Sequence, residues 1–88
     1  MNTLSLIKFQ VQNLFKTHPN VHMNVTLPGG KIHLRNHPVT ITAVYPNIFR
    51  VEDRTGNSPL TYTVQYVELM MGHIEIAELL QKQDRHNH

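Results

Sequence analysis

The spacing of apolar residues changes once along this chain, at His18-Pro19-Asn20, and this change limits the folds open to it. Before it, apolar residues recur every three or four positions, which predicts an amphipathic helix over residues 3–16. Asn2 or Thr3 can cap its start, and proline disfavours helical geometry at the residue before it. The apolar face of the predicted helix is formed by Leu4, Ile7, Val11 and Leu14, with Phe15 beside them.

From Val21 onward apolar residues alternate with polar ones, as in half-buried strands. We expect Ala43 and Tyr45 to share a face with Val39 and Ile41, and Val44 to face the other way. Residues 31–38 are expected to form a long, partly extended loop or an irregular hairpin, and residues 53–57 a hairpin turn. The expected strands cover residues 21–27, 39–45, 49–52, 60–66 and 73–76, with a short turn over 69–72 and a second possibility of helix over 76–83.

Five short strands joined by tight turns favour a closed sheet, because closure removes the exposed edges. The order of elements is that of an SH3-like barrel: a long loop, three tightly connected strands, a one-turn helix and a final strand. We therefore predict a mainly β protein, a small SH3-like β-barrel of about five strands with an N-terminal α-helix. It forms one domain over residues 3–80, with a frayed tail over 84–88.

The composition excludes several classes of protein. The 88 residues include no cysteine, so disulfides and thiolate chemistry are excluded, and a reducing cytoplasm is the expected location. No apolar run approaches the roughly 18 residues that span a bilayer. The net charge is only +2, but residues 1–51 carry five basic residues and no acidic one. Such a distribution predicts a face that accepts anions.

Four segments in a fixed order give the chain a resemblance to a known family. They are Pro28-Gly29-Gly30-Lys31, Tyr45-Pro46-Asn47-Ile48-Phe49, Thr61-Tyr62-Thr63 and His73-Ile74-Glu75-Ile76. With this spacing, residues 4–77 resemble the Veg family of small proteins from Gram-positive bacteria. The resemblance implies an SH3-like barrel with an N-terminal helix. It also implies a stimulator of biofilm formation that acts in gene regulation and is not an enzyme.

Motifs for catalysis, cofactors and metals do not stand out. The sequence has no Gly-x-Ser-x-Gly, no phosphate-binding loop and no His-Glu-x-x-His, so we predict neither an enzyme nor a cofactor. Glu52 and Asp53 are adjacent, so on a strand they point to opposite faces and make a poor acid/base pair. The histidine pairs considered for metal are His33 with His37, His22 with His33, and His86 with His88. We expect no metal there, because three or four ligands must converge.

The remaining candidates concern binding. Cationic and aromatic side chains on a small barrel can bind nucleic acid strands, with phosphates on the cations and bases on the rings. The candidate residues for a nucleic acid or another partner are Lys31, Arg35, Tyr45, Arg50, Arg54 and Tyr66. Phe49 and Tyr62 are expected in the core, and both roles stay open for Tyr45 and Tyr66.

Two functions follow from these observations. The first is a non-enzymatic regulatory binding protein resembling Veg, with a protein or nucleic-acid partner. The alternative is a sequence-tolerant RNA- or DNA-binding barrel that uses a basic face. Neither a membrane nor a small-molecule substrate is expected, and the oligomeric state stays open. The helix face is expected to pack over an open end of the barrel, with a partner groove or dimer interface as the other possibility.

Overall fold

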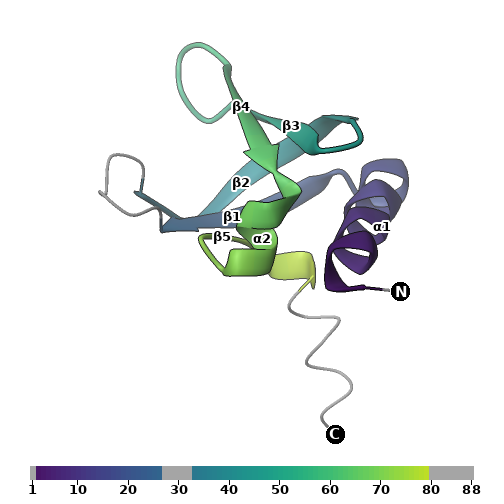
Figure 1. Cartoon of the computed structure of the whole chain (residues 1–88). Helices are drawn as coiled ribbons and strands as arrows, with labels where there is room; N and C mark the ends of the chain where they lie inside the picture. Colours follow the sequence, from purple (N-terminus) through teal and green to yellow (C-terminus); the bar gives the residue numbers. More distant parts are fainter. Residues whose placement is uncertain (1, 27–32, 80–88) are drawn as a thin grey trace, which may run out of the picture.

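The computed structural model describes residues 2–26 and 33–79, which form two helices and a five-stranded antiparallel sheet (Figure 1). The elements in chain order are α1 (Thr3–Thr17), β1 (Asn20–Thr26), β2 (His33–Val44), β3 (Ile48–Asp53), β4 (Leu60–Gln65), α2 (Tyr66–Met71) and β5 (Ile74–Ile76). The predicted mainly β class with an N-terminal helix is confirmed. Neither α1 nor α2 has the length and apolar character that crossing a membrane requires.

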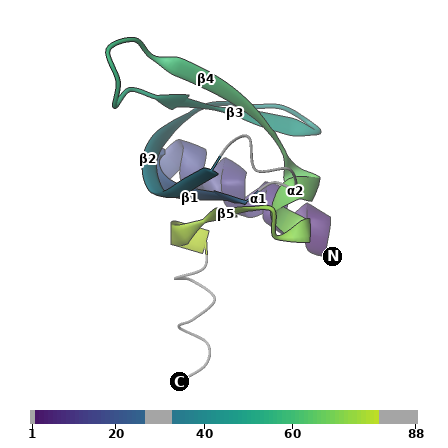
Figure 2. The same cartoon turned by 90° about the vertical axis from the view of Figure 1, so that its left-hand side faces the viewer.

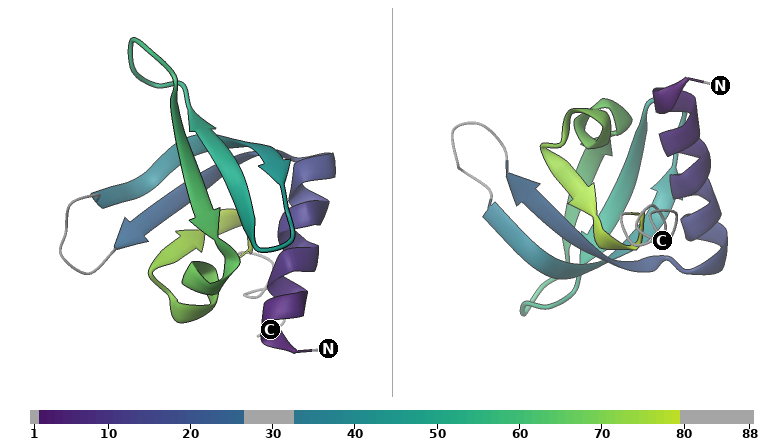
Figure 3. Two further views of the ribbon diagram at one scale, coloured as in Figure 1. Left: turned by 45° about the horizontal axis from the view of Figure 1, so that its top comes forward. Right: turned by 90° about the horizontal axis from the view of Figure 1, so that it is seen from below.

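The helix α1 begins and ends where its sequence indicates. The side-chain oxygen of Asn2 accepts the backbone N–H of Ser5 at 2.8 Å, which satisfies one of the free donors of the first turn. Val11 and Leu14 are buried, and the helix lies along one side of the sheet, in contact with β2 and α2 (Figures 1 and 3). Its apolar face is therefore covered by the chain itself.

The sheet is bent around β2, which takes part in both of its halves. The strand order is β4-β3-β2-β1-β5. The first part of β2, from His33 to Thr40, pairs with β1, and the part from Thr40 to Val44 pairs with β3. Figure 2 shows the β3–β4 pair lying over β1 and β5, with β2 curving between them. Because β4 and β5 are not hydrogen-bonded neighbours in the described residues, the sheet is open, whereas the sequence predicted a closed one.

Residues 33–38 form a strand that pairs irregularly with β1, so of the two forms predicted over residues 31–38 the loop is wrong for this part. A register irregularity between Met23 and Val25 accommodates an extra residue, and Asn36 takes a positive φ of 49° there. The side-chain oxygen of Asn24 accepts the N–H of Asn36 at 2.8 Å. The bulge breaks the alternation of the sequence without ending the strand. Residues 31 and 32 lie outside the described residues.

A second bulge corrects the predicted faces at the end of β2. Ile41 lies opposite Val51, but Ala43 lies opposite Arg50 and Val44 opposite Phe49. Side chains after the bulge therefore exchange faces, since one extra residue inverts the alternation. Val44 packs against the core and Tyr45 is exposed, which is the reverse of the prediction.

The core fills the inside of the bent sheet beneath α1. Phe49 and Tyr66 pack together there, with ring centroids 5.3 Å apart. Tyr66 begins α2, although the sequence predicted that it ends a strand. Gly72 ends α2 with a φ of 83°, a conformation that side chains with a Cβ disfavour. The buried apolar residues are Val11, Leu14, Val21, Met23, Val25, Val39, Ile41, Phe49, Val51, Val64, Tyr66, Ile74, Ile76 and Leu79.

The predicted final strand is confirmed over Ile74–Ile76, where β5 pairs with β1. Residues 77–79 are helical, in agreement with the second possibility for this segment. Residues 80–88, which include the tail predicted over 84–88, lie outside the described residues.

Candidate functional site

Tyr45 and Arg50 are the two predicted site residues that the fold brings together. They lie on either side of the turn between β2 and β3, which is held by a bond of 2.9 Å from the N–H of Tyr45 to the carbonyl of Ile48. Tyr45 is 42% exposed, and the guanidinium carbon of Arg50 lies 5.7 Å from the centroid of the Tyr45 ring. This is the geometry of a cation–π contact. The bulge in β2 creates this pair, because it turns Tyr45 away from the core.

A shallow cleft adjoins this pair and carries a second cation. It lies between the start of α1, the β2–β3 turn and the start of α2, with a volume of about 330 Å³. Ile48 lines it, and Arg50 follows two residues later on the same face of β3. Lys8 lines it from α1, with its ammonium nitrogen 5.9 Å from the ring centroid of Tyr66. The cleft lining is formed by Leu4, Lys8, Asn47, Ile48, Gln65, Tyr66 and Val67.

Tyr66 is a core residue, so of the two roles left open for it the core role holds and the exposed binding ring does not. It is 1% exposed, and its hydroxyl donates a hydrogen bond of 2.9 Å to the carbonyl oxygen of Tyr45. Burial raises the pKa of this hydroxyl, since it disfavours the phenolate. Tyr66 thus supports the backbone of the turn that presents Tyr45.

The other predicted residues do not join this surface. Arg35 is exposed near the start of β2, beside a separate depression that is also lined by Glu75. Arg54 lies beyond the other end of β3, where its Nε donates to a carboxylate oxygen of Glu52. Lys31 lies outside the described residues. The predicted basic face is therefore divided, and only Tyr45 and Arg50 form a local pair.

Most acidic side chains in the described ranges already have a basic or imidazole partner. Of the five carboxylates in residues 2–26 and 33–79, four are paired this way. The pairs are Glu52 with Arg54, Asp53 with His37, Glu68 with His73 and Glu78 with His22. Within the same ranges, Lys8, Lys16, Arg35 and Arg50 make no ion pair. The basic side chains are thus the ones left available to an external charge.

The contacts of Glu78 hold the segment after β5 against β1. Its two carboxylate oxygens accept the backbone N–H and face the ring Nδ1 of His22, each at 2.9 Å. Partial burial acts to raise the pKa of Glu78, but the hydrogen bonds from His22 outweigh it and the pKa is lowered.

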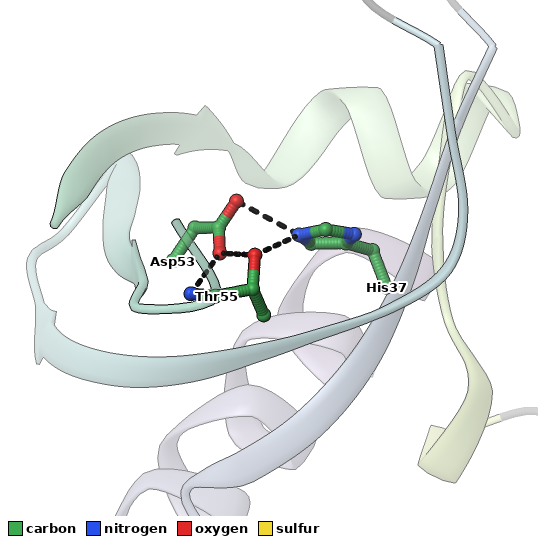
Figure 4. Close-up of polar contacts among 3 residues, drawn as sticks. All are labelled: His37, Asp53 and Thr55. Carbon is green, nitrogen blue, oxygen red and sulfur yellow. Dashed lines mark hydrogen bonds and ion pairs between the residues drawn. The ribbon is translucent and has the colours of Figure 1, made fainter. Parts of the chain in front are cut away.

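A cluster of His37, Asp53 and Thr55 has the residue types of a hydrolytic site, and Figure 4 shows its geometry. Asp53 is buried, and one of its oxygens accepts the N–H and the hydroxyl of Thr55, at 2.9 and 2.6 Å. Its other oxygen lies 2.8 Å from Nε2 of His37. Thr55 also lies 3.3 Å from this same nitrogen.

This arrangement cannot act as a relay. In a catalytic triad, one imidazole nitrogen faces the carboxylate and the other faces the nucleophile. Here the carboxylate and the hydroxyl share one nitrogen, and the hydroxyl donates to the carboxylate. The cluster instead fixes the start of the β3–β4 hairpin and ties it to β2. The hydrogen bonds from the Thr55 hydroxyl and N–H, together with His37, lower the pKa of Asp53, although desolvation opposes them.

The sequence does not predict this cluster, because its local pattern places His37 before the strand of residues 39–45 and Asp53 in the hairpin turn of residues 53–57. The Asp-x-Thr spacing is a usable signal, because Asp often accepts the N–H two residues further on. The partner His37 could not be found locally, since it lies sixteen residues away on β2.

In the parts of the chain that the structure describes, no three histidine or acidic side chains are placed to hold a metal ion. His22 lies opposite Pro38 and His33 lies opposite Thr26, so these two histidines do not face each other across the hairpin. His86 and His88 lie outside the described residues.

Comparison of the chain with protein-family models, with curated proteins and with solved structures finds no match.

Proposed function

We propose that this chain is a non-enzymatic regulatory binding protein of the Veg type, which acts in gene control in the cytoplasm by binding nucleic acid. Its fold is then an SH3-like barrel. The shared strand β2, the tight connections from β2 to β4 and the short helix before β5 support this assignment. The biofilm-related role of the Veg family is the physiological setting that we extend to it.

The observation that carries the nucleic-acid assignment is the exposed Tyr45–Arg50 pair next to a cleft that contains Lys8. Neither cation is used in an ion pair within residues 2–26 and 33–79. Glu52, which lies two residues from Arg50 on the outer side of β3, is neutralised by Arg54. A surface of this kind attracts phosphates and offers an aromatic ring as well.

The proposal gives the His37–Asp53–Thr55 cluster a structural role. Its hydroxyl donates to the carboxylate, and both groups face the same imidazole nitrogen, so the imidazole does not relay a proton from one of its nitrogens to the other. A surface with free cations and an exposed ring is therefore the better basis for a function than this cluster.

The experiment is a titration of the purified protein into labelled single-stranded and duplex nucleic acids, followed by fluorescence anisotropy at several salt concentrations. We expect the binding constant to fall steeply with salt. Arg50→Ala is expected to reduce the slope of log K against log salt by about 0.7 to 0.9, the contribution of one phosphate contact. The matched control is Lys16→Ala, an exposed lysine about two turns along α1 from Lys8. No binding at low salt would reject the proposal.

A protein partner is the second candidate, and one observation favours it. Leu6 and Phe9 are 44% and 61% exposed and lie three residues apart on the outer side of α1. A protein contact there would depend little on salt. Affinity capture with the wild type and with Phe9→Ser as baits, at low and moderate salt, separates this candidate from the first.

A further inference from the structure

We propose that the bound nucleic acid is single-stranded, with one base stacked on the Tyr45–Arg50 pair and the adjoining backbone directed along the cleft toward Lys8. This inference rests on the proposed function and names the class of nucleic acid that the same surface takes. It follows from the planar shape of the Tyr45 and Arg50 side chains as well as from the positive charge of Arg50.

The ring of Tyr45 is accessible to a ligand. Tyr45 is 42% exposed and outside the core, and the planar guanidinium of Arg50 lies 5.7 Å from its ring centroid. Stacked Tyr and Arg side chains present flat surfaces on which an unpaired base can continue the stack. In a duplex both faces of every base are covered by its neighbours. A surface built for stacking therefore selects single strands over duplexes.

The cleft near the ring is lined by apolar and amide residues, among them Ile48, Asn47 and Gln65. Amides can donate to and accept from base edges, which an unpaired base leaves free. Lys8 lines the cleft from α1, and Arg50 lies outside the cleft, two residues after the lining residue Ile48 on the same face of β3.

The main chain of the turn that presents Tyr45 is held from the core. The hydroxyl of buried Tyr66 donates to the carbonyl of Tyr45, and the N–H of Tyr66 donates to the carbonyl of Asn47. Two carbonyls of the turn are thus bonded to one core residue. A turn anchored in this way has little main-chain freedom left to lose on binding.

The experiment compares three labelled ligands of about 12 nucleotides, a length within the range that small barrels cover. They are oligo(dT), an abasic deoxyribose-phosphate strand of the same length, and a duplex. The protein variants are Tyr45→Leu, Tyr45→Phe and Arg50→Lys. Tyr45→Phe keeps the ring, and Arg50→Lys keeps the charge but removes the planar group. Thermal unfolding of each variant checks that it folds.

We expect the wild type to prefer oligo(dT) over both other ligands. Tyr45→Leu should weaken oligo(dT) binding about tenfold, the contribution of one stacked base. It should leave binding of the abasic strand unchanged, and Tyr45→Phe should resemble the wild type. Arg50→Lys should lose part of the preference for oligo(dT) while its salt dependence persists. Because only the main chain of Tyr45 is bonded to Tyr66, we expect Tyr45→Leu to fold.

The other outcomes are distinct. Equal, salt-dependent binding of all three ligands, without an effect of Tyr45→Leu, would overturn this inference and leave the proposed function in place. A preference for the duplex would do the same. Absence of binding to any ligand at low salt would overturn both. If Tyr45→Leu does not fold, the loss of preference in Arg50→Lys decides the matter.

Discussion

The charged residues toward the two ends of β3 lie in opposite environments, one exposed and one buried. At its start, Arg50 lies over the exposed ring of Tyr45 and has no carboxylate partner among the described residues. At its end, Asp53 is buried and its oxygens are engaged by His37 and Thr55. Three positions along one strand thus separate Arg50, whose charge is left free, from Asp53, whose charge is satisfied inside the protein.

This difference indicates which polar groups stabilise the fold and which are available to a partner. A buried carboxylate without partners is costly, so its hydrogen bonds are a condition of folding. An exposed arginine has no such requirement, because water solvates it. The chemically richer cluster is therefore the structural one, and the simpler pair is the better candidate for function.

Asp53→Ala should have the largest effect and should affect stability alone. It removes the acceptor of the Thr55 N–H and hydroxyl and the partner of His37. We expect the thermal midpoint to fall by on the order of 5–10 °C, as measured by circular dichroism. Nucleic acid binding, measured below the new midpoint, should be unchanged. Asp53→Asn keeps one acceptor oxygen, so its thermal midpoint should lie between those of the wild type and Asp53→Ala. A change in nucleic acid binding would show that the two ends of β3 are not independent.

Acid should destabilise the protein by protonating Asp53 and Glu78, with a smaller effect than that of Asp53→Ala. The pKa values of Asp53 and Glu78 are lowered in the folded state. Stability from these groups is therefore complete above their unfolded pKa values, about 3.9 and 4.3, and is lost as pH falls through the lower folded values. Urea unfolding between about pH 5 and pH 3 should show this loss.

The variant Glu78→Gln tests that assignment. It keeps a side chain that can accept from His22 but cannot titrate, so the fall in stability with acid should be shallower than in the wild type. Glu75→Gln, which removes an exposed carboxylate on β5, provides the matched control. An identical slope for the wild type and Glu78→Gln would contradict the role of Glu78.

The sequence predicted those parts of the fold that depend on regular periodicity. The helix over residues 3–16 and the strand from Val21 were found because their apolar residues repeat at 3.6 and 2 positions. The strand after residue 33 was missed because a bulge at Asn36 interrupts its alternation. A bulge depends on the partner strand, and pairing is not visible in a local pattern.

The candidate site, like the fold, was predicted from the sequence only in part. Tyr45 and Arg50 were named from residue type, but the side of the sheet assigned to Tyr45 was wrong because of the second bulge in β2. Tyr66 was left open between a core and a binding role, because its burial depends on contacts with α1 and Phe49 that are distant in the sequence. Arg35 and Arg54 were grouped with them by charge alone, which carries no information about distance.

The smallest effect in this comparison is expected for the carboxylate that lies between the two ends of β3. Glu52 points outward, two residues from Arg50, and its charge is balanced by Arg54. Glu52→Gln leaves Arg54 unpaired and should tighten nucleic acid binding about twofold at low salt, since one exposed charge at about 8 Å contributes ~0.5 kcal/mol in water. Arg54→Gln should weaken binding by a similar factor, because it leaves Glu52 unbalanced beside Arg50. Both effects should vanish as salt rises. Glu75→Gln removes the same charge at the opposite edge of the sheet, so an equal gain in that variant would show that net charge, and not the surface around Tyr45 and Arg50, governs binding.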